Sequence, residues 1–255
     1  MEVVEARPVP SLRPWVRSFA VVESREEATR ELIPEPGFVL GFRYRGGAAE
    51  VEGSRVVPLP PLSATGFRTR SRRIRTLAGS GAVFVRLTEL GAAQLLDAPL
   101  RELHGRTLAL EEVLPGARLV AEQVAESIST SGRLATLERF LLGRLRPSPV
   151  DARVAAAVAA LRQHRGGIRI DALAAAVGLG QDALEKRFRA VVGATPKQLA
   201  SLLRLRSVLR GLAPGRTLSQ LAIEAGYADQ SHFIRAFRAM TGQAPRSFLE
   251  STAFC

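Results

Sequence analysis

Leu221-Ala222-Ile223-Glu224-Ala225-Gly226-Tyr227 repeats an earlier run, Leu173-Ala174-Ala175-Ala176-Val177-Gly178-Leu179, at an offset of 48 residues. Each run predicts a short helix that ends at its glycine, because glycine adopts without steric cost the positive φ that ends many helices. Such self-similarity within one chain indicates a duplicated structural unit. The segment after each glycine then decides what kind of unit is repeated in the C-terminal part of the chain.

A second matching segment comes after each run, now at an offset of 49, so the later copy has one extra residue in its turn. The first copy places apolar, glycine and proline residues at Leu184, Phe188, Gly193, Pro196 and Leu199, and the second at Phe233, Phe237, Gly242, Pro245 and Phe248. Each unit is thus a short helix, a glycine turn and a longer helix, which is the helix-turn-helix pattern. The two units cover about residues 168–193 and 216–242.

The longer helix of the later unit has a polar and basic face. Phe233, Phe237 and Met240 recur at helical spacing and predict a buried stripe. The residues expected on or near the opposite face are Gln230, Ser231, His232, Arg235 and Arg238. Gln, Ser and Arg side chains hydrogen-bond base edges in the major groove, which admits one helix. A solvated face would also be polar, but the helix pair, glycine turn and basic face together favour DNA binding.

The longer helix of the earlier unit has a mixed face. Leu184, Phe188 and Val191 predict its buried stripe. Its outward residues are Asp182, Glu185, Lys186 and Arg189. Carboxylates repel phosphates but accept a hydrogen bond from cytosine N4. This face therefore favours base reading less strongly than the later one.

Between the units, residues 196–212 predict a helix of about 26 Å at 1.5 Å per residue. Two reading helices enter successive major grooves when they lie about 34 Å apart, and a rigid connector of this size is compatible with that spacing. We expect Leu202, Leu203 and Leu209 to pack against both units.

The charge of the chain is uneven. Lys and Arg number 36 against 24 Asp and Glu, which gives a net charge of +12. Residues 151–255 hold 15 basic and seven acidic side chains, and residues 1–150 hold 21 and 17. A basic C-terminal part attracts polyanions. High genomic GC content explains the excess of Arg over Lys, but not this segregation of charge.

The run from Ala225 to Arg238, followed by Thr241-Gly242-Gln243-Ala244-Pro245, resembles the signature of AraC/XylS-type bacterial transcription regulators. The resemblance covers about residues 151–250 and implies a seven-helix, all-α double helix-turn-helix domain at 151–255. It further implies base contacts by Asp182, Glu185, Lys186, Gln230, Ser231, His232 and Arg235. Charge and position make Arg189, Lys197 and Arg238 candidates for phosphate contacts. Gly180 stands where the family usually has a helix-capping Ser.

The part before the helical repeat predicts an α+β domain at residues 1–146, with a boundary at Arg146-Pro147-Ser148-Pro149. Short apolar stretches at 38–42, 54–57 and 81–87 are strand signals. Helical periodicity follows near 89–96, 116–128 and 132–145. Apolar stripes on the last two helices favour either a homodimer contact or packing on the same domain. The stripe residues are Val124, Ile128, Leu134, Leu137 and Leu141.

Residues 1–146 resemble more loosely the N-terminal domain of one AraC-type subgroup, through Ile33-Pro34-Glu35-Pro36-Gly37 and Pro99-Leu100-Arg101-Glu102-Leu103. The subgroup often has Asp-Gly in place of Pro36-Gly37. The resemblance implies that this domain senses a small molecule or mediates dimerisation. No residue stands out as an anchor for such a ligand.

Two further clusters in this part have alternative interpretations. Aromatic residues could line a pocket, but clustered aromatics are more often core. They are Trp15, Phe19, Phe38, Phe42, Tyr44, Phe67 and Phe84. Five arginines between Arg68 and Arg75 could meet an acidic ligand or DNA phosphate, although a solvated strand or loop is the simpler interpretation.

Several classes of protein are excluded by what the sequence lacks. Cys255 is the only cysteine, so the chain has no internal disulfide and no thiolate zinc cluster. His104, His164 and His232 have no metal-ligand spacing, so we expect neither metal nor cofactor. No catalytic motif and no long apolar run occurs, so we expect a cytoplasmic protein that is not an enzyme.

The sequence thus predicts a sequence-specific DNA-binding transcription regulator that responds to a small-molecule effector. Double-stranded DNA is the expected partner, with RNA polymerase and a second copy of the chain as further partners. Two alternatives stay open. One is a nucleic-acid-binding protein that uses charge alone and is indifferent to sequence. The other is an effector-binding protein whose helical domain no longer reads DNA.

Overall fold

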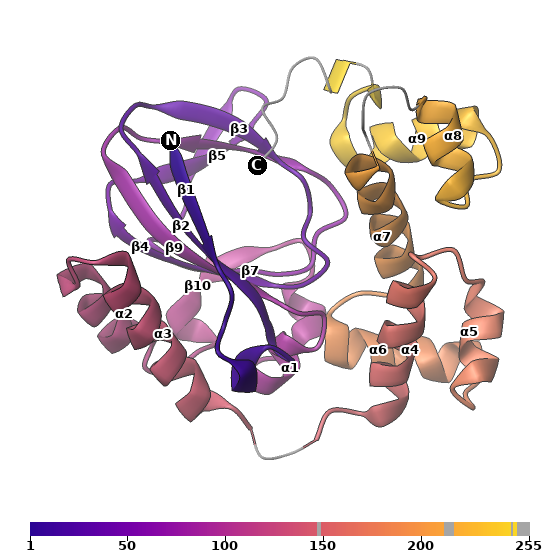
Figure 1. Cartoon of the computed structure of the whole chain (residues 1–255), viewed down its shortest axis with the longest axis horizontal. Coiled ribbons are helices and arrows are strands. Elements are labelled where there is room, and N and C mark those ends of the chain that lie inside the picture. Colours follow the sequence, from indigo (N-terminus) through magenta and orange to yellow (C-terminus); the bar gives the residue numbers. More distant parts are fainter. Residues whose placement is uncertain (147–148, 212–216, 246, 249–255) are drawn as a thin grey trace.

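The computed structural model describes residues 1–146, 149–211, 217–245 and 247–248, and its N-terminal part contains two antiparallel sheets (Figure 1). The larger sheet has the order β1-β2-β9-β4-β7-β10, and the smaller has the order β3-β8-β5-β6. The strands are β1 (Glu2–Ala6), β2 (Val16–Ser24), β3 (Ala28–Leu32), β4 (Val39–Arg45), β5 (Ala48–Glu52), β6 (Arg55–Pro58), β7 (Leu62–Thr65), β8 (Arg72–Thr76), β9 (Ser80–Leu87) and β10 (Thr107–Ala109). The expected strands at 38–42, 54–57 and 81–87 correspond to β4, β6 and β9.

Helices cover one face of the larger sheet. They are α1 (Gly91–Leu95), α2 (Ala117–Glu126) and α3 (Thr130–Arg144), with short 3₁₀ turns at Pro10–Leu12, Leu100–Leu103 and Leu110–Glu112. In β9, Val83 and Val85 are fully buried in the hydrophobic core, whereas Phe84 between them is half-buried and lines the space between the two sheets. This alternation with period two follows from the pleat of a strand. The N-terminal part is α+β, as its sequence predicts.

The apolar stripes of α2 and α3 mostly pack inside the chain. Val124, Leu137 and Leu141 are fully buried and Leu134 is half-buried, whereas Ile128 is 97% exposed. Packing on the same domain is therefore confirmed for most of the stripe. A homodimer stays a prediction.

The aromatic residues of the N-terminal part are mostly core. Those with at most 1% exposure are Phe19, Phe38, Phe42 and Phe67. Trp15, Tyr44 and Phe84 are half-buried. Of the predicted set, Phe84 lines the inter-sheet cavity described below.

The arginine-rich stretch from Arg68 to Arg75 forms β8 and the segment before it. Its charges are partly neutralised within the fold, because Arg68 and Arg72 both pair with Glu50, at 3.1 and 3.5 Å. Arg70 and Arg73 are exposed. The stretch is therefore neither a wholly solvated strand nor an open basic patch.

The C-terminal part is all helical. Its helices are α4 (Ala152–Gln163), α5 (Ile170–Ala176), α6 (Gln181–Val192), α7 (Pro196–Arg210), α8 (Leu218–Glu224) and α9 (Gln230–Thr241). The sequence predicted seven helices here, but the described residues of this part hold these six, followed by helical residues at 245, 247 and 248. Every helix in the described ranges is too short or too polar to cross a membrane.

Both repeated units have the same local geometry. The short helices α5 and α8 are followed by Gly178 and Gly226, at φ values of 65° and 81°. The longer helices α6 and α9 end at Gly193 and Gly242, at 73° and 74°. A side chain is strained in this left-handed region, so the four glycines are required by the backbone of the repeat.

The buried stripes of the two longer helices differ in one position from the predicted ones. Leu184, Phe188 and Val192 are buried in α6, and Phe233, Phe237 and Thr241 are buried in α9. The expected third members, Val191 and Met240, are only half-buried. The stripe follows the spacing i, i+4, i+8 because the last turn of each helix faces the core at that position.

Helix α7 connects the two units, with α4, α5 and α6 at one end and α8 and α9 at the other (Figure 1). It runs for 15 residues, or about 22 Å, and is shorter than the predicted 196–212 because Gly211 caps it. Leu212 lies outside the described residues. Leu202 and Leu203 are buried and Leu209 is half-buried, in agreement with their expected packing role.

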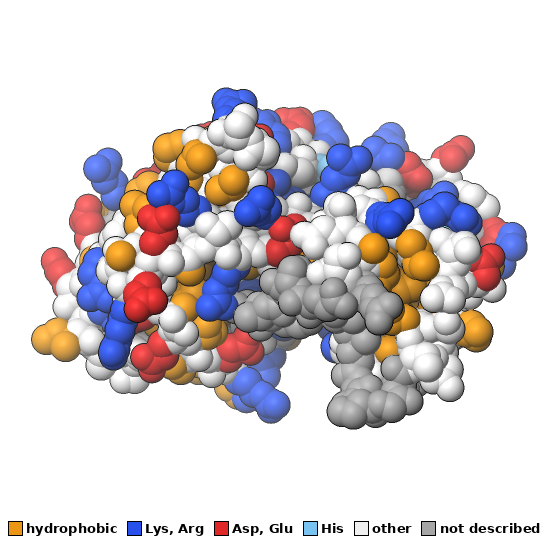
Figure 2. Space-filling model, turned by 90° about the horizontal axis from the view of Figure 1, so that it is seen from above, with side chains coloured by type: hydrophobic (Ala, Val, Ile, Leu, Met, Phe, Trp, Pro, Cys, Tyr) orange, Lys and Arg blue, Asp and Glu red, His pale blue; other side chains and the backbone are white. Residues whose placement is uncertain are grey.

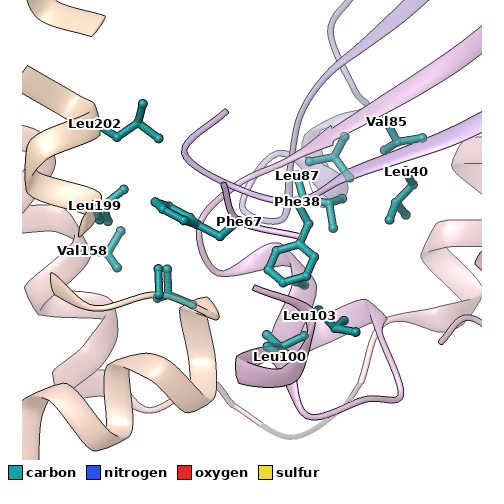
Figure 3. Close-up of a cluster of buried hydrophobic side chains, with 14 of the residues drawn as sticks. Phe38, Leu40, Phe67, Val85, Leu87, Leu100, Leu103, Val158, Leu199 and Leu202 are labelled. Atoms are coloured by element: carbon teal, nitrogen blue, oxygen red, sulfur yellow. The ribbon is translucent and has the colours of Figure 1, made fainter. Parts of the chain in front are cut away.

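One hydrophobic cluster runs from the sheets into the helical part (Figure 3). Phe38, Phe67 and Leu100 from the N-terminal part are continuous in it with Val158 of α4 and Leu199 and Leu202 of α7. The two parts are therefore packed on each other across a shared core. The division into domains at 1–146 and 151–255 stays a prediction.

Candidate nucleic-acid interface

Helix α9 begins at a firm cap. The carboxylate Oδ1 of Asp229 accepts a hydrogen bond from the backbone N–H of His232 at 2.6 Å, which satisfies one of the unpaired donors of the first turn. The preceding helix α8 opens with a capping box, in which Thr217 and Gln220 bond each other's backbone N–H groups. These bonds fix where the outward face of α9 starts.

The outward face of α9 is exposed and carries unpaired cations. Gln230, Ser231, Arg235 and Arg238 are all exposed. Within the described part of the chain, no carboxylate lies within ion-pair distance of Arg235 or Arg238. These guanidinium groups are thus available to an anionic or hydrogen-bonding partner.

His232 is held by its own turn. Its Nδ1 accepts the backbone N–H of Ala228 at 3.3 Å, and its ring packs edge-on against Tyr227 with the centroids 5.3 Å apart. Burial raises the pKa of Tyr227, whose ring faces the guanidinium of Arg204 at 5.3 Å. A base contact by His232 stays a prediction, and its observed contacts are those that hold the turn.

The outward face of α6 is also exposed but less basic. Asp182, Glu185, Lys186 and Arg189 are all exposed, as predicted. Glu185 and Arg189 form an ion pair at 2.7 Å, so part of the positive charge is neutralised within the helix. Gly180 gives α6 no side-chain cap, in contrast to Asp229 at the matching position before α9. The longer helices of the two units are therefore not equivalent.

Lys197 lies apart from both of these faces. It is exposed in the first turn of α7, which follows α6 after three residues. The structure thus distributes the predicted residues over three helices, with α6 and α9 at opposite ends of α7 (Figure 1).

The N-terminal part contacts both units at the C-terminal ends of their longer helices. The Ser71 backbone N–H and hydroxyl donate to the carbonyl oxygens of Met240 and Thr241, at 2.6 and 3.2 Å. At the other unit, His104 lies 3.0 Å from the carbonyl oxygen of Gly193. Because these contacts involve helix ends, the outward faces of α6 and α9 stay exposed.

Positive charge does not dominate every face of the molecule. On the face in Figure 2, blue and red side chains are interspersed over the N-terminal half on the left. The local, unpaired cations of α9 are therefore more informative about binding than the net charge of +12.

A cavity between the two sheets is a second candidate site, which the sequence analysis did not predict. Its two connected hollows have volumes of about 170 and 60 Å³ and share Val22, Phe84 and Arg72 in their lining. Burial, together with the nearby charge of Arg68, lowers the pKa of Arg72 to about 10. Burial also lowers the pKa of Arg43, whose side chain has no carboxylate partner in the part of the chain described.

The signal for this site was present in the strand pattern. Arg43 shares a strand face with Val39, and Arg72 shares one with Ile74, so each arginine stands at an inward position of its strand. An inward charged residue in a half-buried strand is rare without a partner or a function.

Comparison with known sequences identifies the helical part. Residues 173–251 match the family model of a helix-turn-helix domain. No curated protein sequence matches this chain.

Solved structures with low identity resemble the chain. A structure of ToxT from Vibrio cholerae is 11% identical, with 99% of this chain and 100% of that chain covered and a TM-score of 0.48. Wild-type ToxT from Vibrio cholerae strain SCE256, bound to an unsaturated fatty acid, is 14% identical over 92% and 95%, with a TM-score of 0.48. The C-terminal domain of AraT, a response regulator from Geobacillus stearothermophilus, is 17% identical over 42% and 92%, with a TM-score of 0.39.

The repeated glycine turns, the buried stripes and the family match define a DNA-binding helix-turn-helix protein. Residues 173–251 are a helix-turn-helix domain of the AraC type, and this domain supports a DNA-binding transcription regulator. The roles of individual residues at the interface are proposals, developed below.

Replacing Asp229 by Ala tests the cap of α9. We expect Asp229→Ala to lower the free energy of unfolding by about 1 kcal/mol, because one helix N–H loses its acceptor. Asp229→Asn keeps the acceptor and should stay near wild type. Urea unfolding followed by circular dichroism measures both. Equal stabilities of the Ala and Asn variants would contradict the capping role.

Proposed function

We propose that the chain is a sequence-specific DNA-binding regulator in which α9 reads bases in one major groove and α6 in the next. The observation that carries the proposal is the outward face of α9, where Gln230, Ser231 and Arg235 are exposed and Arg235 has no carboxylate partner among the described residues. The opposite face is fixed in the core by Phe233 and Phe237. The helix can therefore present only this face to DNA.

The chemistry of the α9 face suits base edges. An arginine forks onto O6 and N7 of guanine, and a glutamine pairs with N6 and N7 of adenine. Arg235 and Gln230 offer these two groups about one and a half helical turns apart. On α6, Lys186 offers a donor, while Asp182 and Glu185 can accept from cytosine N4.

Other cations position the protein on the duplex. Arg238 and Lys197 are exposed and suited to phosphate contacts, which set register but carry no sequence information. Arg189 is paired with Glu185, so its phosphate contact requires that pair to open. RNA polymerase and a second copy of the chain are further proposed partners.

A charge-only binder is the main alternative. It would depend on a broad field of one sign, whereas the face in Figure 2 mixes both signs. The two functions are separated by competition at fixed salt, because a specific regulator keeps a preference of at least about 10³ for its own site. A loss of discrimination against random duplex would overturn the proposal.

Two arginines of α9 should have different effects. We expect Arg235→Ala to weaken binding to the selected site by about 1–3 kcal/mol and to relax preference at one base position. We expect Arg238→Ala to weaken binding to all sequences alike and to reduce the salt slope by about 1. Fluorescence anisotropy on the selected duplex, its single-base variants and random duplex measures both effects.

The control for this pair is Arg139→Ala, which removes an exposed arginine from α3. It should leave both affinities unchanged. If Arg235→Ala and Arg139→Ala behave alike, or if Arg235→Ala weakens random duplex as much as the selected site, Arg235 does not read a base.

The inter-sheet cavity supports the effector part of the proposal. It combines an apolar lining, including Val22 and Phe84, with the guanidinium groups of Arg43 and Arg72. A cation with lowered pKa in an apolar cavity favours a bound anion, because the low dielectric strengthens the attraction. We therefore propose that the effector is a small, mainly apolar molecule with one acidic group.

Benzoate and benzyl alcohol form a matched pair of probes for the cavity. We expect benzoate to raise the unfolding temperature of the full chain and benzyl alcohol to have little effect, because only the anion neutralises Arg43. Arg43→Gln should remove the difference between the probes. Differential scanning fluorimetry at constant ionic strength measures it. Equal shifts by both probes in the wild type would contradict the assignment of an acidic effector.

A further inference from the structure

A second cleft lies between the N-terminal part and helices α4 and α7, and it shares only Ile33 and Glu35 with the lining of the inter-sheet cavity. Its volume is about 550 Å³, which is the size of pocket that holds a small metabolite. Five arginines line it: Arg17 from β2, Arg162 and Arg165 from α4 and the turn after it, and Arg206 and Arg210 from α7. The cleft is distinct from the inter-sheet cavity in chemistry, because its polar lining is almost entirely charged.

Two glutamates, Glu35 and Glu89, face these arginines, and both are shared. Glu89 is only 2% exposed and pairs with Arg162, with Nε and Oε1 3.0 Å apart. It also lies 3.4 Å from Nη2 of Arg17. Glu35 contacts Arg17 at 3.4 Å and Arg206 at 3.3 Å. Glu35 also lies 3.7 Å from Nε of Arg86. The two carboxylates thus serve Arg86 and three arginines of the cleft, and the cleft keeps a surplus of positive charge.

Arg165 and Arg210 add to that surplus. Neither has an ion pair with any residue in the described ranges. Among the described residues, Arg210 donates only to the carbonyl oxygen of Arg206 in its own helix, at 3.2 Å. Their guanidinium groups therefore keep nearly all of their donors for a ligand.

The inner end of the cleft also holds a buried donor. Nη2 of Arg17 is buried and makes no hydrogen bond among the described residues, although Oε1 of Glu89 lies 3.4 Å from it. Burial lowers the pKa of Arg17, and the nearby Glu89 and Glu35 only partly offset this effect. An anion in the cleft would add to this partial compensation.

The backbone places Arg165 at the cleft in an unfavourable conformation. Its φ is +50°, and it is the only non-glycine residue with positive φ in the described part of the chain. This is a C-terminal helix position where glycine is preferred, and an L-residue is strained there. Strain of this kind is concentrated at functional sites.

We propose that this cleft binds a small phosphate-bearing metabolite. Arginine forks match phosphate oxygens in pairs, and five of them around one space suit a ligand with two or more negative charges. An apolar acid would leave these donors unpaired. The ligand would contact Arg17 on the N-terminal side and Arg165 and Arg210 on the helical side, and would thus join the two parts of the chain.

A ligand in this cleft would contact α7, the helix that connects the unit of α6 to the unit of α9. Helix α7 lies between the two units and carries Arg206, which already donates to the carbonyl oxygen of Pro34 at 2.7 Å. A ligand that adds contacts across the same boundary stabilises the arrangement in which the two parts are packed together. The ligand changes the free energy of DNA binding by the difference between its own binding free energies for the DNA-bound and the DNA-free chain.

The test uses isothermal titration calorimetry on the DNA-free full chain, with fructose 1,6-bisphosphate as the probe at constant ionic strength. We expect saturable binding at one site per chain. The double variant Arg165→Gly with Arg210→Ala should weaken it by about tenfold or more, because it removes two charge-assisted contacts. Glycine is chosen at position 165 because it adopts the positive φ without strain.

A charge-matched control and a conservative variant accompany this experiment. Arg55→Ala with Arg118→Ala removes two exposed arginines away from the cleft and should leave binding unchanged. Arg165→Lys with Arg210→Lys keeps the charge but loses the forks, and should bind with intermediate affinity. Absence of saturable binding, equal weakening by the control, or saturable binding of benzoate that the cleft variant abolishes would each overturn the proposal.

Discussion

The structure depends most on the burial of one stripe of each recognition helix, because this burial decides which side chains face outward. In α9 the rings of Phe233 and Phe237 lie 5.6 Å apart at a steep angle, and Tyr227 and Phe248 extend the same row of edge-to-face contacts. Such contacts add to the hydrophobic stabilisation of the core. Gly226 allows the chain to turn from α8 into α9 at a positive φ. With this row in place, rotation of α9 would expose its aromatic rings to water, so Arg235 and Arg238 are confined to the solvent side.

The same constraint explains how the N-terminal part can be attached without covering the side that we propose to face DNA. The shared core passes through Phe38, Phe67 and Leu199. His104 and Ser71 of the N-terminal part contact the C-terminal ends of α6 and α9. A Cβ on Gly193 would lie 2.9 Å from the carbonyl oxygen of Leu100, so the two parts approach there at backbone distance. Changes in the N-terminal part can therefore reach α6 through its end. This gives a physical route by which a ligand in the inter-sheet cavity or in the arginine cleft would alter the arrangement of the two units.

The helical part could be predicted closely from the sequence because its signals are local. The glycines at 178, 193, 226 and 242 and the phenylalanine spacing each act within one turn of helix, and all are confirmed. The third stripe position was wrong by one residue at Val191 and Met240, since the last turn depends on its packing neighbours. The sites of the N-terminal part could not be predicted, because they depend on contacts between distant residues. Arg43 and Arg72 come from two different sheets, and Glu89 meets Arg162 across 73 residues of sequence. The only sequence signal for the cavity was an arginine, Arg43 or Arg72, at an inward position of each of two strands.

The central claim is that two unequal helices, α6 and α9, read one face of a duplex together. Hydroxyl-radical footprinting of the full chain, on a duplex selected from random sequence, tests it most directly. The account predicts two protected patches separated by about 10 base pairs, as expected for successive major grooves. The patch assigned to α9 should be the more strongly protected, because α6 neutralises part of its own charge. A single patch, or uniform protection that moves with the ends of the fragment, would contradict the account.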